Sequence, residues 1–115
     1  MLFRVDPQSA LGLADQIAGQ VRRALADGAL AAGERLPPAR ELAKGLDVNM
    51  HTVLRAYAAL RDEGLIELRR GRGAVVRAGV DAASSELQQR IQALVELADW
   101  LGMSRDELIA QIRRV

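Results

Sequence analysis

Arginine side chains are most concentrated in one short stretch of the sequence, Arg69-Arg70-Gly71-Arg72-Gly73. A guanidinium group binds phosphate oxygens and the edge of guanine, and the negative potential of a narrow minor groove attracts it. The two glycines permit a tight turn with the arginines at its tip. The stretch therefore indicates contact with a nucleic acid, and the alternative is a surface hairpin whose arginines are simply solvated.

A second group of side chains with suitable chemistry stands at the predicted start of a helix. Asn49 suits the N-cap position, and it is followed by Met50, His51 and Thr52, with Arg55 one turn further along. Asparagine can bond the edge of adenine, threonine can bond bases or phosphates, and arginine can pair with guanine or phosphate. Taken singly, these could be solvated residues at a helix start. Beside an arginine-rich hairpin they favour contact with DNA.

The composition argues against an enzyme. The 115 residues include no cysteine, and His51 is the one histidine. Disulfides, thiolate catalysis and cysteine-ligated metals are therefore excluded. The arginine-glycine stretch lacks the lysine and the hydroxyl of a phosphate-binding P-loop. We expect no catalytic residue, no metal and no cofactor.

The sequence also lacks the signals of a membrane or secreted protein. No apolar run approaches the roughly 18 to 20 residues of a spanning helix. The first residues, Met1-Leu2-Phe3-Arg4, lead to an acid and a proline rather than into a signal peptide. We therefore expect a cytoplasmic protein without a membrane partner.

Charge is distributed unevenly along the chain. The net charge is only +1, but residues 1–77 carry twelve basic against nine acidic side chains, and residues 78–115 carry four against six. For phosphate binding, a local basic face matters more than the total charge. We therefore expect contact with a nucleic acid in the first two-thirds of the chain.

The spacing of apolar residues predicts a scaffold helix that starts at residue 9 and stops at Gly28. Its inner face consists of Leu13, Ile17, Val21, Ala24 and Leu25. Its outer face consists of Asp15, Gln16, Gln20, Arg22, Arg23 and Asp27. Residues 28–38 are expected to form a linker that Leu36 pins to the core.

A helix–turn–helix is predicted after this linker. Pro38 suits the first turn of a helix over residues 39–46, and Asp47 takes the turn, where a left-handed backbone is needed. Val48 fills the corner, and a third helix runs over residues 50–63. The buried face of this third helix is predicted to hold Val53, Ala56, Tyr57 and Leu60.

Two short strand-like runs, residues 65–68 and 74–77, flank the arginine-glycine stretch. A short helix, a tight turn, a second helix and a basic hairpin, in this order, indicate a winged helix-turn-helix, which places one helix in the major groove of DNA. The fold class that we expect is mainly α with a small β-hairpin.

The sequence resembles the GntR family of bacterial transcriptional regulators over roughly residues 10–77. The residues that carry this resemblance are Leu36-Pro37-Pro38-Ala39-Arg40-Glu41-Leu42-Ala43, Val48-Asn49, Thr52-Val53, Arg55-Ala56-Tyr57, Leu60, Glu63-Gly64-Leu65-Ile66 and Arg70-Gly71-Arg72-Gly73.

The resemblance implies DNA contacts for named positions of this chain. They are Arg40, Asn49, Met50, His51, Thr52, Arg70 and Gly71, with Arg55 and Arg72 as backbone contacts and Arg69 and Gly73 completing the basic hairpin. Many relatives have arginine where this chain has Met50 or Leu54, and glycine where it has Asp47. These departures affect the bases that are read and leave the expected fold unchanged.

The last third of the chain predicts a two-helix tail. After a linker over residues 79–85, an apolar stripe runs to Gly102, and Ser104 with Glu107 forms the pattern of a capping box for a last helix. Two such helices cannot form a core of their own. The tail resembles that of the YtrA subfamily, which implies dimerisation through it. We expect the interface to contain Leu87, Ile91, Leu94, Val95, Ala98, Leu101, Leu108 and Ile112.

We therefore expect a DNA-binding domain over residues 1–78 and a dimerisation tail over residues 79–115. A two-fold dimer presents two recognition helices to the half-sites of a palindromic operator in double-stranded DNA. Repression is favoured over activation, and a small effector could bind between the tail helices. Two alternatives are a tail that folds back on its own subunit and a winged helix that binds protein or RNA instead of duplex DNA.

Overall fold

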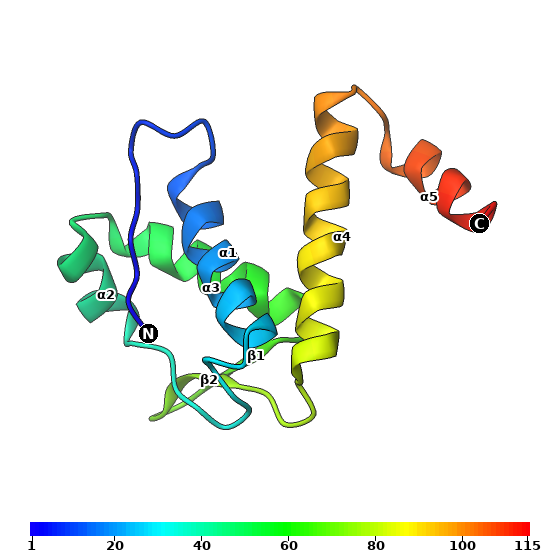
Figure 1. The fold of residues 1–115 in the computed structure, drawn as a ribbon. Coiled ribbons are helices and arrows are strands. Elements are labelled where there is room, and N and C mark those ends of the chain that lie inside the picture. Colours follow the sequence, from blue (N-terminus) through cyan, green and yellow to red (C-terminus); the bar gives the residue numbers. More distant parts are fainter.

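The computed structural model describes all 115 residues as five helices and one hairpin (Figure 1). In chain order the elements are α1 (Leu13–Ala26), α2 (Ala39–Leu46), α3 (Met50–Asp62), β1 (Ile66–Arg69), β2 (Gly73–Val76), α4 (Ala82–Trp100) and α5 (Arg105–Arg113). The expected mainly α fold with a small hairpin is confirmed.

The α1 helix begins four residues later than the sequence predicts. The backbone N–H of Leu11 donates to the Ser9 hydroxyl at 3.1 Å, and the N–H of Ser9 donates to the Asp6 carbonyl at 3.1 Å. Such local bonds hold residues 6–11 in turns and compete with helix formation. The predicted inner face is correct, because Ile17, Val21, Ala24 and Leu25 are buried and Leu13 is half-buried.

Two glutamines on α1 hold the N-terminal arm against the helix. Gln16 accepts from the backbone N–H of Asp6 at 2.7 Å and donates to the Asp6 carbonyl at 2.9 Å. One turn on, Gln20 forms the same pair of bonds with the backbone of Arg4. Each amide side chain thus satisfies a backbone N–H and a backbone carbonyl of the extended arm, which has no partner strand.

Arg22 does not lie on an exposed face of α1, contrary to the sequence prediction. Its side chain is buried, and its guanidinium forms a bidentate ion pair with Glu63, with the closest approach, Nε to Oε1, at 2.8 Å. Glu63 is the C-cap residue of α3. The ion pair therefore fastens the scaffold helix to the end of the third helix, which explains why a cation is tolerated inside.

The turn between α2 and α3 follows the sequence prediction closely. Asp47 adopts the left-handed conformation with φ 55° and ψ 48°, and Val48 packs partly buried against the core. The Asn49 side chain caps α3 by accepting from the N–H of His51 at 2.8 Å. From the buried face of α3, the Tyr57 hydroxyl donates to the Pro37 carbonyl at 2.6 Å, which ties α3 to the segment before α2.

The hairpin pairs Ile66 with Val76 and Arg69 with Gly73, one residue away from the predicted strand limits. Its second strand is paired on both sides, because residues 33–36, expected to be a plain linker, also bond to β2. The N–H of Leu36 donates to the Ala74 carbonyl, and the N–H of Val76 donates to the Glu34 carbonyl, each at 2.9 Å.

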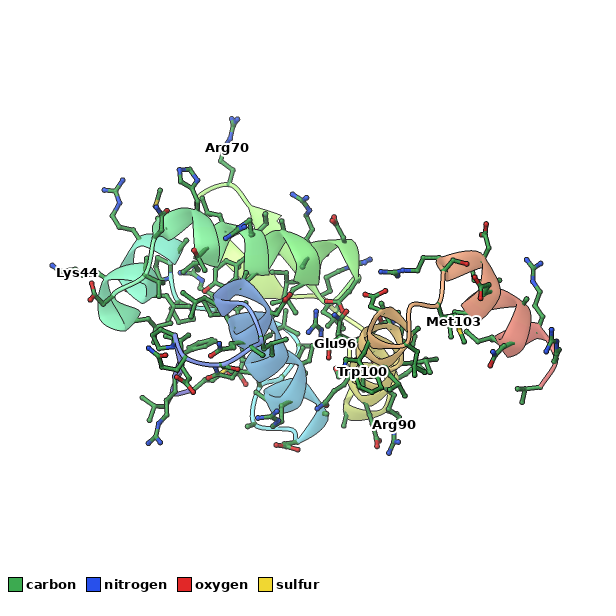
Figure 2. All side chains as sticks on the ribbon, turned by 90° about the horizontal axis from the view of Figure 1, so that it is seen from above. Lys44, Arg70, Arg90, Glu96, Trp100 and Met103 are labelled. Atoms are coloured by element: carbon green, nitrogen blue, oxygen red, sulfur yellow. The ribbon has the colours of Figure 1, made fainter.

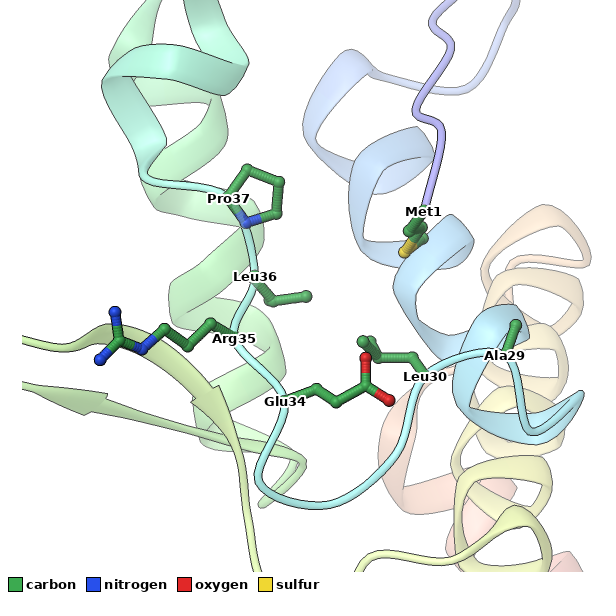
Figure 3. A pocket seen from close by; sticks show the side chains of 7 residues that line it. All are labelled: Met1, Ala29, Leu30, Glu34, Arg35, Leu36 and Pro37. Carbon is green, nitrogen blue, oxygen red and sulfur yellow. The ribbon is translucent and has the colours of Figure 1, made fainter.

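Figure 3 shows the side chains that alternate along this third strand-like segment. Leu36 points toward Leu30 and the interior, where its side chain is buried as predicted, and Arg35 points the other way, over the hairpin. The base of the hairpin is therefore held from both edges. Eighteen buried residues form one core beneath it, contributed by the arm, α1, the segment between α1 and α2, α2, α3 and the hairpin.

The tail starts earlier than expected, because α4 begins at Ala82. Asp81 is its N-cap and forms a complete capping box with Ser84, in which each side chain bonds the other residue's backbone N–H, at 2.8 and 3.1 Å. At α5 the predicted box is half formed. The Ser104 hydroxyl accepts from the N–H of Glu107, whose carboxylate bonds that hydroxyl instead of the Ser104 backbone.

The two tail helices lie differently against the first domain. The α4 helix packs alongside α1, whereas α5 extends from the far end of α4 and lies away from the body of the molecule (Figure 1). Within one chain, the alternative of a tail that folds back on its own subunit therefore describes α4 and not α5. No helix is long and apolar enough to cross a membrane.

Candidate nucleic-acid interface

The first turn of α3 presents three of its four predicted contact residues to solvent. Asn49, Met50 and His51 are exposed, and Arg55 is exposed one turn further along. Thr52 is an exception, because its side chain is only 8% accessible. It lies beside Val53 on the inward side of the helix, so the expectation that Thr52 is exposed is wrong.

Four of the predicted arginines have no acidic partner. Arg40 on α2, Arg55 on α3, and Arg70 and Arg72 on the hairpin are exposed and form none of the ion pairs in the structure. An unpaired guanidinium loses no existing ion pair when it binds a phosphate.

Arg69 differs from the other hairpin arginines. Its Nε lies 2.8 Å from Oε2 of Glu67, and Oε1 of the same carboxylate lies 3.6 Å from Nε of Arg77. The carboxylate offsets part of the positive charge at the end of β1, next to the turn. A phosphate contact by Arg69 must therefore compete with this carboxylate.

The tip of the hairpin projects from the molecule. Figure 2 shows Arg70 extending outward beyond α3, away from α1 and the tail helices. Gly71 follows with φ 80°, in open space, so the glycine is required by the backbone conformation and not by a close neighbour. The Arg72 N–H donates to the Arg69 carbonyl at 3.1 Å and closes the turn.

A groove of about 390 Å³ brings the separate parts of this face together. Its walls come from the start of α2, from α3 and from the hairpin. The groove is lined by Pro37, Pro38, Ala39, Leu54, Tyr57, Leu68, Arg69, Arg70, Gly73 and Ala74. The groove therefore joins the hairpin to the second turn of α3 and to the segment that opens α2.

The sequence prediction missed three exposed residues near this surface. Lys44 is an exposed, unpaired cation of α2, and Leu54 and Leu68 are exposed apolar residues that line the groove. Lys44 could have been found from the helical spacing, since it lies four residues after Arg40. Nothing local in the sequence brings Leu54 next to Leu68.

The residues predicted for dimerisation divide into two groups. Leu87, Ile91, Leu94, Leu101 and Ile112 are exposed, whereas Ala98 and Leu108 are buried within the chain and Val95 is half-buried. The exposed apolar set also includes members that were not predicted, namely Leu97, Trp100 and Ile109.

The family model for gntR bacterial regulatory proteins matches residues 13–76, from the start of α1 to the end of β2. The chain belongs to the gntR family of bacterial regulatory proteins. The resemblance seen in the sequence is therefore confirmed, and the winged helix-turn-helix is the family's domain.

The similarity of this gntR-family protein to individual relatives extends through the tail. It is 29% identical to the HTH-type transcriptional repressor YtrA of Bacillus subtilis (strain 168) over 99% of this chain and 92% of that protein. It is 32% identical to the HTH-type transcriptional regulator Rv1152 of Mycobacterium tuberculosis, over 98% of this chain and 93% of that one.

A solved structure shows the same arrangement. YtrA from Sulfolobus acidocaldarius, a GntR-family transcription factor, is 39% identical to this chain and superimposes with a TM-score of 0.63, covering 96% of this chain and 92% of that one. The similarity to YtrA proteins over both the domain and the tail agrees with the expected subfamily.

Proposed function

We propose that this gntR-family protein is a transcriptional regulator that binds specific sequences in double-stranded DNA. The observation that carries the proposal is the single surface formed by the exposed start of α3, the unpaired arginines of α2 and the hairpin, and the groove between them. A helix of this kind fits the major groove with its N-terminal residues at the base edges. The membership of the family supports the same assignment.

The proposed roles follow from position and chemistry. Asn49, Met50 and His51 meet base edges at the start of α3, and Arg40 and Arg55 bind the phosphates beside them. At the hairpin, Arg70 binds the phosphates that border the minor groove, with Arg72 on the adjacent backbone. Thr52 is left with a supporting role, since its side chain is nearly buried. Lys44 is added as a phosphate contact.

We propose further that the chain acts as a homodimer on a palindromic operator. Residues 1–78 bind DNA, and residues 79–115 associate with a second copy through the exposed apolar side chains of α4 and α5. A contiguous exposed apolar surface is typical of a protein interface. Two-fold symmetry then demands an inverted repeat in the DNA. Repression is the proposed effect, as in the name of the B. subtilis relative, with no cofactor and no enzymatic step.

Selection of bound sequences from random duplex DNA at near-physiological salt tests this function. We expect enrichment of an inverted repeat, since each subunit reads one half-site. The Arg40→Ala variant should bind the selected repeat more weakly while its circular dichroism stays that of the wild type. Arg23→Ala, at an exposed and unpaired arginine of α1, is the matched control and should bind normally. Failure to enrich any duplex would contradict the proposal and favour a protein or RNA partner.

A further inference from the structure

Two large apolar side chains lie on the otherwise polar outer face of α3. Met50 is 36% exposed and Leu54 is 41% exposed. Because they are four residues apart, they lie one above the other on the helix surface. Their neighbours on the outer face, His51 and Arg55, are polar and also exposed to solvent. The pair therefore forms a narrow apolar strip within the proposed DNA-binding surface.

The strip continues into the groove beside the hairpin. Leu54 lines one wall of the groove, and the exposed Leu68 lines the other, with Tyr57 between the helices. Arg69 and Arg70 stand on the hairpin side of the same groove. An apolar floor with a cationic edge complements a partner that is negatively charged outside and carries apolar groups within reach. Duplex DNA has this combination.

We infer that Met50 and Leu54 read the C5-methyl groups of thymines in the major groove of the operator. The inference rests on the proposed function and names the chemistry of the bases at that site. Met50 is the first residue of α3, and residues at the start of a recognition helix meet base edges. Among the groups that the major groove displays, the thymine methyl is the apolar one. The flexible thioether of methionine adapts well to such a contact.

The spacing of the two side chains predicts the spacing of the thymines. Side chains four residues apart on a helix have Cβ atoms about 5–6 Å apart. Successive bases on one DNA strand are about 3.4 Å apart. Met50 and Leu54 should therefore read two thymines that are neighbours or are separated by a single base in each half-site.

The test replaces each thymine of the selected operator, one at a time, by deoxyuridine. This replacement removes the methyl group and leaves the hydrogen-bonding edge unchanged. Burial of one methyl-sized group corresponds to about a fourfold change in affinity. We expect the Kd of the wild-type protein to rise by about that factor at one or two positions of each half-site and to stay constant at the others.

A double-mutant cycle assigns each position to its side chain. With Met50→Ala the deoxyuridine effect should disappear at one sensitive position, and with Leu54→Ala at the other. Leu11→Ala is the matched control, because Leu11 is also 41% exposed but lies before α1, and it should leave every effect in place.

The outcomes separate this inference from the proposed function. Selection of an operator whose sensitive thymines do not couple to Met50 or Leu54 overturns the inference and leaves the function intact. A uniform loss of affinity in both alanine variants, independent of the thymine methyls, also overturns it and indicates contact with deoxyribose instead. Selection of no operator overturns the function and the inference together.

Discussion

Single residues determine how strongly the hairpin can hold DNA. Arg70 is exposed, has no acidic partner and projects beyond α3 (Figure 2), whereas Arg69 is already paired with Glu67 at 2.8 Å. A free guanidinium releases a counterion from DNA when it binds a phosphate, but a guanidinium in an ion pair must first exchange its partner. Arg70 should therefore contribute more than Arg69 to the affinity for DNA.

Replacement of Arg70 tests this inequality through the salt dependence of binding. Removing one guanidinium–phosphate interaction reduces the slope of log K against log salt concentration by about 0.9 in magnitude. Arg70→Ala should reduce the slope by about that amount for each subunit on the operator, and Arg69→Ala by less. Fluorescence anisotropy over a salt series measures the slopes, with Arg23→Ala on α1 as control. Equal changes for Arg69 and Arg70 would contradict the role that we assign to Glu67.

The cap residue Asp81 adds a pH dependence at the start of α4. The backbone N–H of Ser84, 2.8 Å from its carboxylate, lowers the pKa of Asp81 below its ordinary value. A carboxyl whose pKa is lower in the folded state stabilises that state above its unfolded pKa of about 3.9, and this stabilisation is lost as the pH falls through the folded pKa. Loosening of the cap is therefore confined to acidic solution.

The amide resonance of Ser84 reports this titration directly. In an NMR series from pH 6 to acid, we expect that resonance to move with a midpoint below about 3.9. In Asp81→Asn the movement should vanish while the helix start stays formed, because asparagine caps as well as aspartate. A midpoint at or above the ordinary value would show that the capping bond does not form in solution.

At the scale of elements, one ion pair links the scaffold helix α1 to the end of α3. Arg22 of α1 and Glu63 at the end of α3 are bonded twice, and the Arg22 side chain is only 6% accessible. Removing one member of a buried pair leaves the other charge without compensation, whereas replacing both can be nearly neutral. Loss of one partner should therefore lower the free energy of unfolding more than replacement of both.

Urea unfolding of three variants distinguishes these effects. Arg22→Ala should lower the free energy of unfolding by about 3 kcal/mol, at the lower end of the range because Glu63 is partly exposed. The paired change Arg22→Met with Glu63→Gln should cost less. Arg23→Ala, an exposed neighbour, should stay within about 0.5 kcal/mol of the wild type. An equal loss from the single and the paired changes would show that the two side chains act independently.

The elements also show which parts of the fold are predictable from sequence. The α2 and α3 helices and the turn between them are predictable nearly to the residue, because Pro38, Asp47 and Asn49 are local signals whose effect does not depend on the rest of the chain. The first-turn cap of α4 escapes such a prediction, since its pattern of aspartate followed by serine is weaker than the serine–glutamate pattern.

Long-range contacts account for the remaining errors. The sequence pattern places Arg22 outside because its partner lies 41 residues away, and it makes residues 33–36 a linker because their pairing is to β2, far along the chain. The exposed start of α3 is predictable from its own spacing, but the groove between Leu54 and Leu68 exists only after the hairpin folds against the helix. Local patterns specify elements, and tertiary contacts specify the surface.

At the scale of the whole molecule, the tail leaves an apolar surface uncovered. Toward α1, the α4 helix presents Gln89, Gln92 and Ala93, which line a shallow groove between the two helices. Its leucines and Ile91 remain exposed, and α5 stands away from the domain (Figure 1). Apolar surface that stays exposed to water raises the free energy of the isolated subunit, so covering these side chains with a partner is favourable. The proposed dimer would cover this area with the same surface of a second copy of the chain.

A charge placed on this surface tests the dimer without disturbing the subunit. Ile91 and Leu94 are 43% and 40% exposed, so Ile91→Glu and Leu94→Glu leave the core of the subunit intact. Both variants should sediment as monomers and bind the operator far more weakly, because a monomer reads only one half-site. Leu2→Glu, at a residue 77% exposed on the N-terminal arm, should remain dimeric.

Fluorescence of the single tryptophan gives a second measurement of the monomer–dimer equilibrium. Trp100 is 82% exposed in the isolated subunit, at the end of α4 from which α5 departs. If the tails associate there, the wild-type emission should shift to longer wavelengths on dilution, and the emission of Ile91→Glu should be at the longer wavelength at every concentration. A glutamate variant that stays dimeric would place the interface on the DNA-binding domain.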